Sequence, residues 1–228
     1  MIFRAIAVFV VLAVAAAPAV FGQSAGAQAN EPLSVEMMII RENSMSPLRE
    51  QNLFALSQIE SAVGRGGFED ELYSALERLV FAGTMHRIVG RGGHILNYFP
   101  DVRQEAARQL GVVGTEEARA ILLRAGLVEL QPMVLQELLN SLGNIPAEDN
   151  AQTIAAIVWI GNRFHNSLLP NNHVALAAVN ALESIAGRDG GLTCANAFWY
   201  LFSVLEGPYV LAVRERAREV IDGLRVNG

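Results

Sequence analysis

One pattern of apolar positions recurs four times along the chain and predicts stacked pairs of helices. In the clearest copy an aliphatic residue, Val102, is followed by two alanines four and five positions later and by Leu110 eight positions later. The copies begin at Val102, Val134, Val174 and Val213, so they lie 32, 40 and 39 residues apart. A period of about 20–50 residues is typical of arrays in which each helical pair buries its apolar face against the next pair.

No segment alternates between apolar and polar residues as a half-buried strand would, so the pattern predicts an all-α chain of about nine or ten helices. We expect an armadillo-like α-solenoid (an alpha-alpha superhelix) of four helical-hairpin repeats plus a C-terminal capping helix. The repeat domain covers 47–228, with units near 47–82, 101–126, 132–164 and 172–205 and a cap at 208–225. A glycine-rich insertion at 83–100 separates the first two units. It is expected to hold a short helix near Met85–Val89 and then a loop.

The first 29 residues have the pattern of a secretory signal peptide. Arg4 precedes an apolar run, 5–21, and the segment closes with Ala27-Gln28-Ala29, the small-x-small pattern that a signal peptidase reads. The apolar run is 17 residues long, whereas a helix that spans a bilayer needs about 20. We therefore predict cleavage, export to the periplasm or the medium, and no stable membrane insertion of the mature chain. Residues 30–46 form an N-terminal extension, which is either a capping helix or a tether.

Charge and residue usage exclude several classes of function. The chain has 17 basic and 23 acidic residues, a net charge of −6, and this balance argues against nucleic acid, whose phosphates require clustered positive charge. All the basic residues are arginine, so no lysine can form a Schiff base or reach a nucleotide phosphate. Cys194 is the one cysteine, so no internal disulfide can form, and its apolar neighbours favour a small buried side chain.

The segment PDVRQEAARQLGVVGTEEARAILLRAGLVE, at 100–129, resembles the HEAT-like repeat, in the subclass also seen in phycobilin-lyase-related proteins. The matching residues are Val102, Arg103, Ala106, Ala107, Leu110, Gly111 and Gly114. The resemblance is specific over 98–146 and extends to about residue 224. It implies antiparallel helix pairs packed into a curved superhelix. In that family an Asp and an Arg form a ladder between units; Asp101 and Arg103 match this pair, and the other copies lack it.

Two identical VGRGG strings, at 63–67 and 89–93, are candidates for anion binding. Backbone amides of glycine-rich turns can surround an anion, and Arg65 or Arg91, the latter close to His94, could hold a phosphate or carboxylate. The alternative is a glycine that ends a helix, followed by a turn.

Histidines and carboxylates do not form a recognisable site in the sequence. The four histidines lack the spacing of a zinc site. The acidic pairs lie at predicted helix starts, where the helix dipole explains them. We identify no catalytic residue, no metal site and no cofactor.

Aromatic side chains are the candidates for contact with a partner. The run 198–202 makes its helix apolar almost all round, which predicts either full burial or contact with another protein. Burial is the favoured interpretation, and the alternative is an exposed Trp199, because aromatic residues dominate binding hot spots. Trp159, near Arg163 in the sequence, has the same two interpretations. The predicted partner-binding residues are Arg65, Arg91, His94, Trp159, Arg163 and Trp199.

The sequence favours an exported, non-enzymatic HEAT-like repeat protein that serves as a scaffold for a protein or peptide in the cell envelope. This interpretation is supported by the expected extended surface, the export signal and the lack of a catalytic constellation. It depends mainly on analogy with other proteins of the same fold. Two alternatives stay open. One is a lyase-like module, or one that binds a small anionic ligand, near Arg65, Arg91 and His94. The other is a structural protein that self-associates into a homo-oligomer through its aromatic helix.

Overall fold

The computed structural model describes residues 34–66, 70–165, 170–192 and 194–226. The predicted signal peptide, 1–29, lies outside these ranges. Within them the chain forms ten α-helices and no strand, so the all-α prediction is confirmed. The helices are α1 (Val35–Ser44), α2 (Arg49–Gly64), α3 (Asp70–Val80), α4 (Pro100–Val113), α5 (Glu116–Val128), α6 (Pro132–Asn144), α7 (Ala151–His165), α8 (Asn172–Asp189), α9 (Ala195–Glu206) and α10 (Leu211–Val226).

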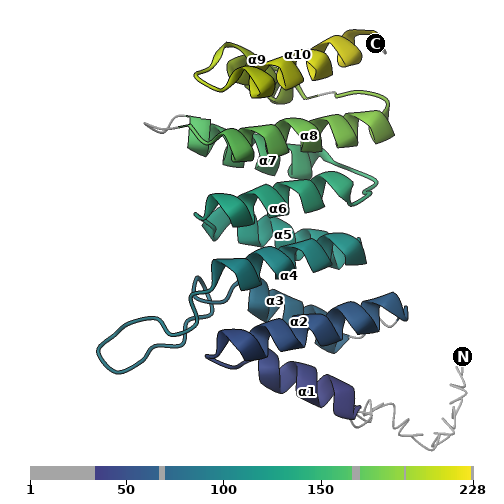
Figure 1. Ribbon diagram of the computed structural model, residues 1–228. Coiled ribbons are helices and arrows are strands. Elements are labelled where there is room, and N and C mark those ends of the chain that lie inside the picture. The colour runs from purple at the N-terminus through teal and green to yellow at the C-terminus, as the bar shows by residue number, and fades with distance from the viewer. Residues whose placement is uncertain (1–33, 67–69, 166–169, 193, 227–228) are drawn as a thin grey trace, which may run out of the picture. The chain divides into compact units, whose positions relative to one another are not determined.

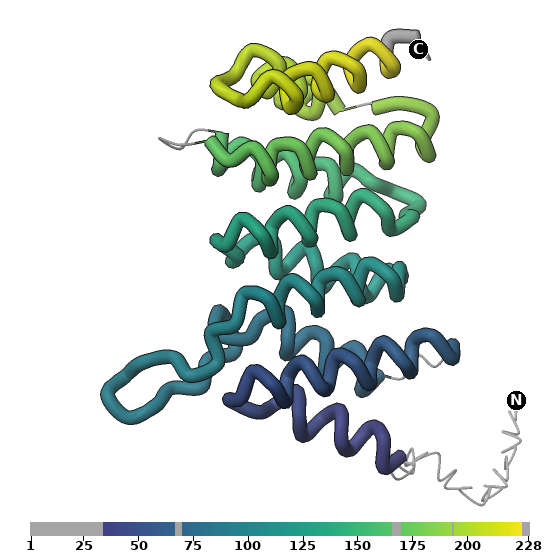
Figure 2. Tube along the Cα trace, viewed as in Figure 1, coloured from purple at the N-terminus to yellow at the C-terminus, as the bar shows by residue number. Residues whose placement is uncertain are grey.

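The helices pack in two layers, as Figures 1 and 2 show. One layer consists of α2, α4, α6, α8 and α10, each beside the next, and the other consists of α1, α3, α5, α7 and α9. Successive helices also pack on each other across the two layers, so each pair forms a helical hairpin. This arrangement is that of an α-solenoid, and the predicted fold class is confirmed. The described part of the N-terminal extension forms α1, which packs on α2 and α3.

Local signals in the sequence begin and end the helices. Thr115 caps α5, where its hydroxyl accepts a hydrogen bond from the backbone N–H of Ala118 at 3.2 Å. Pro100 and Pro132 occupy the first turns of α4 and α6, where a backbone N–H is not needed. Gly114 ends α4 with a left-handed φ of 67°, a conformation that glycine adopts without strain. These short, well-capped turns place consecutive helices antiparallel.

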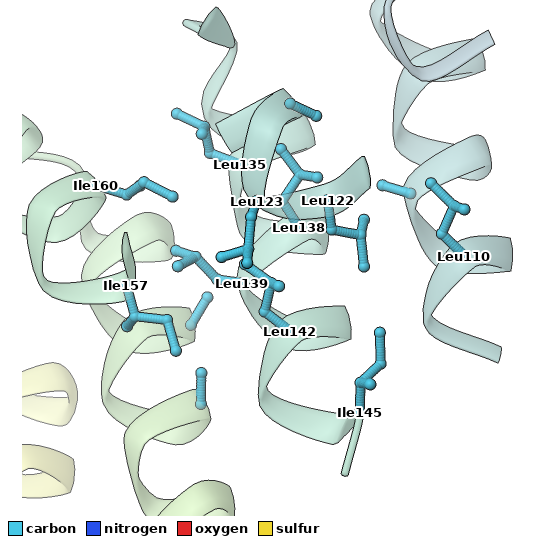
Figure 3. Close-up of a cluster of buried hydrophobic side chains, with 14 of the residues drawn as sticks. Leu110, Leu122, Leu123, Leu135, Leu138, Leu139, Leu142, Ile145, Ile157 and Ile160 are labelled. Atoms are coloured by element: carbon cyan, nitrogen blue, oxygen red, sulfur yellow. The ribbon is translucent and has the colours of Figure 1, made fainter. Parts of the chain in front are cut away.

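The repeated apolar positions point into one continuous core. In Figure 3, Leu138 and Leu142 of α6 lie between Leu110 of α4 and Ile157 of α7, and all four side chains are fully buried. The valines that begin the first three copies are also fully buried, and Val213 is nearly so. Each unit therefore buries its apolar face against its neighbours, which explains why the array needs several units to be stable.

Small residues let neighbouring helices approach closely. A Cβ added at Gly143 of α6 would lie 2.7 Å from the Cα of Ala181 in α8. A Cβ at Gly111 of α4 would lie 2.7 Å from the Cβ of Ser141 in α6. Ser141 is buried at this contact, and its hydroxyl donates to the carbonyl oxygen of Ala107 in α4 at 3.0 Å. The spacing between the units is thus set by side chains of minimal size.

The insertion between α3 and α4 is an irregular hairpin, residues 83–98, that projects from the stack (Figure 1). Its two arms meet at the Val89–Ile95 bridge. The predicted short helix near Met85–Val89 is wrong. The side chain of Asn97 accepts a hydrogen bond from the backbone N–H of Ile88 at 2.9 Å and donates one to the carbonyl oxygen of His86 at 2.8 Å. These backbone groups are therefore satisfied without a helix.

None of the helices in the described ranges has the length and hydropathy that a bilayer-spanning segment requires.

Candidate functional site

A buried ion pair anchors the hairpin to the stack. Arg103 of α4 is fully buried, and its Nε donates to Glu129 Oε2 at 2.6 Å. The same guanidinium donates through Nη1 to the carbonyl oxygen of Ala82 at 3.1 Å and lies 4.7 Å from the ring centroid of Tyr98. Ala82 immediately precedes the first arm of the hairpin, and Tyr98 ends the second arm. One arginine therefore fixes both arms of the hairpin to α4 and to the turn between α5 and α6.

The Asp–Arg ladder implied by the family resemblance takes a different form here. Asp101 reaches the preceding unit, where Arg49 Nε donates to its Oδ2 at 2.7 Å. Burial acts to raise the pKa of Asp101, but the hydrogen bond and charge of Arg49, helped by backbone N–H groups, outweigh burial and lower that pKa. Arg103 instead pairs with Glu129 in the turn that follows its own unit. The two residues connect separate neighbours and do not form a repeated pair.

A concavity of about 420 Å³ lies at the base of the hairpin, bounded also by the last turn of α3 and by the turn between α1 and α2. We call it the hairpin pocket. Its lining contains Arg78, His86 and Arg87 but no carboxylate. Four further concavities in the described ranges each have at least one Asp or Glu in their lining. The volume falls in the range of small-molecule sites, about 300–1,000 Å³, so this pocket is suited to a small anion.

The two arginines of the hairpin pocket differ in their partners. Arg87 Nε donates to the carbonyl oxygen of Thr84 at 2.6 Å, and the side chain is exposed at the pocket rim. Arg78 forms no hydrogen bond or ion pair with the described residues, and its Nε is buried without an acceptor. His86 packs edge-on against Phe81, with the ring centroids 5.8 Å apart. Arg78 therefore brings unused hydrogen-bonding capacity to the pocket.

Three of the predicted partner-binding residues lie on the neighbouring helices α7 and α9, and we call them the aromatic surface: Trp159, Arg163 and Trp199. The Arg163 guanidinium lies 4.6 Å from the ring centroid of Trp159, and its Nη2 donates to the carbonyl oxygen of Glu129 at 2.7 Å. Trp159 is 45% exposed and Trp199 is 73% exposed. The favoured prediction of burial therefore holds for Tyr200, which is 1% exposed, and is wrong for Trp199, because α9 buries one face only.

The other three predicted residues do not come together. Arg65 follows α2 and pairs with Glu36 of α1 at 2.5 Å. Arg91 and His94 are exposed in the hairpin. The C-terminal end of α2 lies across the stack from the hairpin (Figure 1), so the two VGRGG strings cannot hold one ligand between them.

Sequence reasoning missed the hairpin pocket. Arg78 lies in the last turn of α3, where a basic residue is expected from the helix dipole alone. The pocket also joins segments more than thirty residues apart, from the α1–α2 turn to the hairpin. One signal was present in the sequence: no Asp or Glu occurs from Ala82 to Pro100, although the chain as a whole is acidic.

No model of a known protein family matches the chain, and no curated protein matches it. Among solved structures the chain is similar to the complex of CpcE and CpcF of phycocyanin lyase from Nostoc sp. PCC7120. The two align with a TM-score of 0.55 and 20% sequence identity, over 87% of this chain and 69% of that chain. At this identity the likeness shows a shared fold, and that fold is the HEAT-like solenoid expected from the repeat at 100–129.

The prediction that the protein is not an enzyme is contradicted by this likeness, because the same helical-repeat fold occurs in a lyase. The prediction rested on the lack of a catalytic constellation in a single sequence. The similar structure is a complex of two proteins. The absence of a catalytic motif therefore does not exclude an enzymatic role for a chain of this fold.

Proposed function

We propose that the protein is a lyase-type module of the HEAT-like class, which binds a small organic anion and acts together with a protein partner. The observation that carries the proposal is the hairpin. Between Ala82 and Pro100 it holds two arginines and two histidines and no carboxylate, in a chain with a net charge of −6. The fold shared with a lyase complex supports the lyase-type role, and the presence of two proteins in that complex supports a partner.

Apolar side chains on the hairpin suggest the second property of the ligand. Met85, Val89, Leu96 and Tyr98 are all exposed there. Exposed apolar groups gathered on a projecting segment are typical of a binding surface. A small organic molecule that carries an anionic group on an apolar body would cover these side chains and also neutralise the positive charge of the hairpin. An inorganic ion alone would leave them in water.

The aromatic surface is proposed as the contact with the protein partner. Trp and Arg are enriched among the residues that dominate protein–protein binding energy. Trp159, Arg163 and Trp199 lie on α7 and α9, whereas the hairpin follows α3, so the two proposed functions occupy different units of the solenoid. Export of the chain is also a proposal, supported by the signal-peptide pattern at 1–29 and tested by a secretion reporter fused to that segment.

Thermal unfolding of the full chain with a panel of carboxylates and phosphate esters tests ligand binding. A ligand at about 100 times its Kd stabilises the folded state by about 2.7 kcal/mol, so at least one member should raise the Tm clearly. A hairpin variant, Arg87→Gln with Arg91→Gln, should lose this response. A matched variant with the same charge change on α10, Arg214→Gln with Arg218→Gln, should keep it. The proposal is wrong if no compound raises the Tm, or if the two variants respond equally.

A further inference from the structure

The walls of the hairpin pocket are held by two buried asparagines. Asn52 is 1% exposed, and its Nδ2 donates to the carbonyl oxygen of Asn43 in the last turn of α1, at 2.9 Å, and to that of Ser46 in the following turn, at 3.1 Å. In the hairpin part of the lining, Asn97 binds the backbone of Ile88 and His86. Since both parts of the lining are held by internal hydrogen bonds, the pocket is formed without a ligand. A preformed concavity with a few polar groups is typical of a small-molecule site.

Arg78 brings a hydrogen-bond donor to this pocket that the protein does not satisfy. Its Nε is buried and has no acceptor, and the side chain makes no ion pair with the described residues. The Nε is enclosed by the protein, so a ligand in the pocket would bind the terminal nitrogens of Arg78, which also form no hydrogen bond with the described residues. The negative end of the α3 dipole explains a cation at this position, but it supplies no acceptor for the guanidinium group. An oxyanion is the strongest kind of acceptor for such a group.

Other groups in the lining suit the same ligand. Arg87 uses Nε for the carbonyl oxygen of Thr84, and its two terminal nitrogens form no hydrogen bond with the described residues. The Ser46 hydroxyl accepts from the N–H of Leu48 at 3.0 Å and still has its own proton to donate. No carboxylate in the lining competes for these donors. Met45 and Met85 form apolar parts of the lining, which fit the body of an organic molecule.

We propose that the hairpin pocket binds the oxyanion group of a small organic molecule, a phosphate or a carboxylate, between Arg78 and Arg87. The inference rests on the proposed function, and it adds the location of the site and the chemical group that the site recognises. The location differs from the one expected from the sequence, because Arg91 and His94 are not in the lining and the C-terminal end of α2, which Arg65 follows, lies across the stack from the hairpin (Figure 1).

Isothermal titration of the full chain, with inorganic phosphate and with succinate as separate probes, tests this site. At least one probe should bind. Arg78→Gln should weaken that binding about tenfold or more, because a charge-assisted hydrogen bond is lost. Arg87→Gln, at an exposed position, should weaken it as well. Arg218→Gln on the exposed face of α10 removes the same charge and should change the Kd less than about twofold. Binding of phosphate alone indicates a phosphate group as the natural ligand, and binding of succinate alone indicates a carboxylate.

Three results would overturn the inference. The first is that neither probe binds at ~10 mM; a Tm response to a larger organic anion would then still support the proposed function. The second is binding that both pocket variants retain in full. The third is binding that Arg91→Gln abolishes and Arg78→Gln retains, which would place the ligand at the hairpin tip and leave the proposed function intact. Circular dichroism shows whether Arg78→Gln folds. If it does not fold, the titration of Arg87→Gln tests whether the probe binds in the pocket.

Discussion

The stack of α4, α6 and α8 and the hairpin at 83–98 hold their shapes in different ways. In the stack, aliphatic side chains and small residues fill the space between helices, and Gly143 meets Ala181 with no room for another carbon atom. In the hairpin, Asn97 and Arg103 hold the backbone through hydrogen bonds, and the nearby cations have no carboxylate partner. A region filled by aliphatic and small side chains serves as a scaffold, whereas a region with cations that lack a carboxylate partner can recognise a charged ligand.

Arg103 joins the two regions, so replacing it should have the largest effect. Arg103→Ala leaves Glu129 buried without its ion-pair partner and frees the carbonyl oxygen of Ala82. Removal of one partner from a buried ion pair costs about 3–5 kcal/mol, measured as the free energy of unfolding in urea. The control is Arg108→Ala, whose ion pairs with Glu60 and Glu105 are partly exposed; it should cost less than about 1 kcal/mol. Equal losses in the two variants would contradict the anchoring role.

A methyl group at Gly143 should damage the stack directly. Its Cβ would lie 2.7 Å from the backbone of Ala181, so α6 and α8 must move apart. Overpacking of this kind costs about 1–3 kcal/mol. Gly187→Ala in α8 is the matched control, because a Cβ there meets nothing within 4 Å, and it should be neutral or stabilise by about 0.4–1 kcal/mol. If Gly143→Ala unfolds at the same urea concentration as the parent chain, the close approach is not real.

Tyr200 tests how well the stack satisfies its own polar groups near the C-terminal end. Its hydroxyl is buried without a partner, and burial raises its pKa. Tyr200→Phe removes this unpaired group and should be neutral or stabilise by about 1 kcal/mol. Tyr209→Phe is the comparison, since that hydroxyl lies 3.0 Å from His165 Nδ1, and it should destabilise by about 0.5–1.5 kcal/mol. Thermal unfolding that shows the opposite order would reveal a hidden partner for Tyr200.

The smallest effect on stability is expected at the aromatic surface. Trp199 is 73% exposed, so Trp199→Ala should change the free energy of unfolding by less than about 0.5 kcal/mol. If a second copy of the chain is the partner, light scattering should show a mass that rises with concentration in the parent chain and stays monomeric in Trp199→Ala. A parent chain that is monomeric at every concentration would exclude a second copy. A large loss of stability would mean that Trp199 packs inside the fold.

The stack could be predicted from the sequence because its signals are local. Val102, Leu110 and Gly114 lie within one helix and its cap, and the helical period alone places the first two on one face. The hairpin could not be predicted, because its shape depends on contacts between distant residues, such as Arg103 with Ala82. The exposure of Trp199 could not be predicted either. Trp199 and Tyr200 are adjacent aromatic residues, and Tyr200 is the buried one because its side of α9 packs against Gly161 of α7.

Hydrogen exchange of the full chain, with and without a saturating oxyanion probe, tests the difference between the two regions most directly. Amide exchange in 44–52 and in 78–97 should slow when the probe binds, because these segments line the hairpin pocket. Exchange in α6 and α8 should be slow in both states and unchanged by the probe. Protection centred on α6 and α8, or no change around the pocket when the probe is bound, would contradict the account.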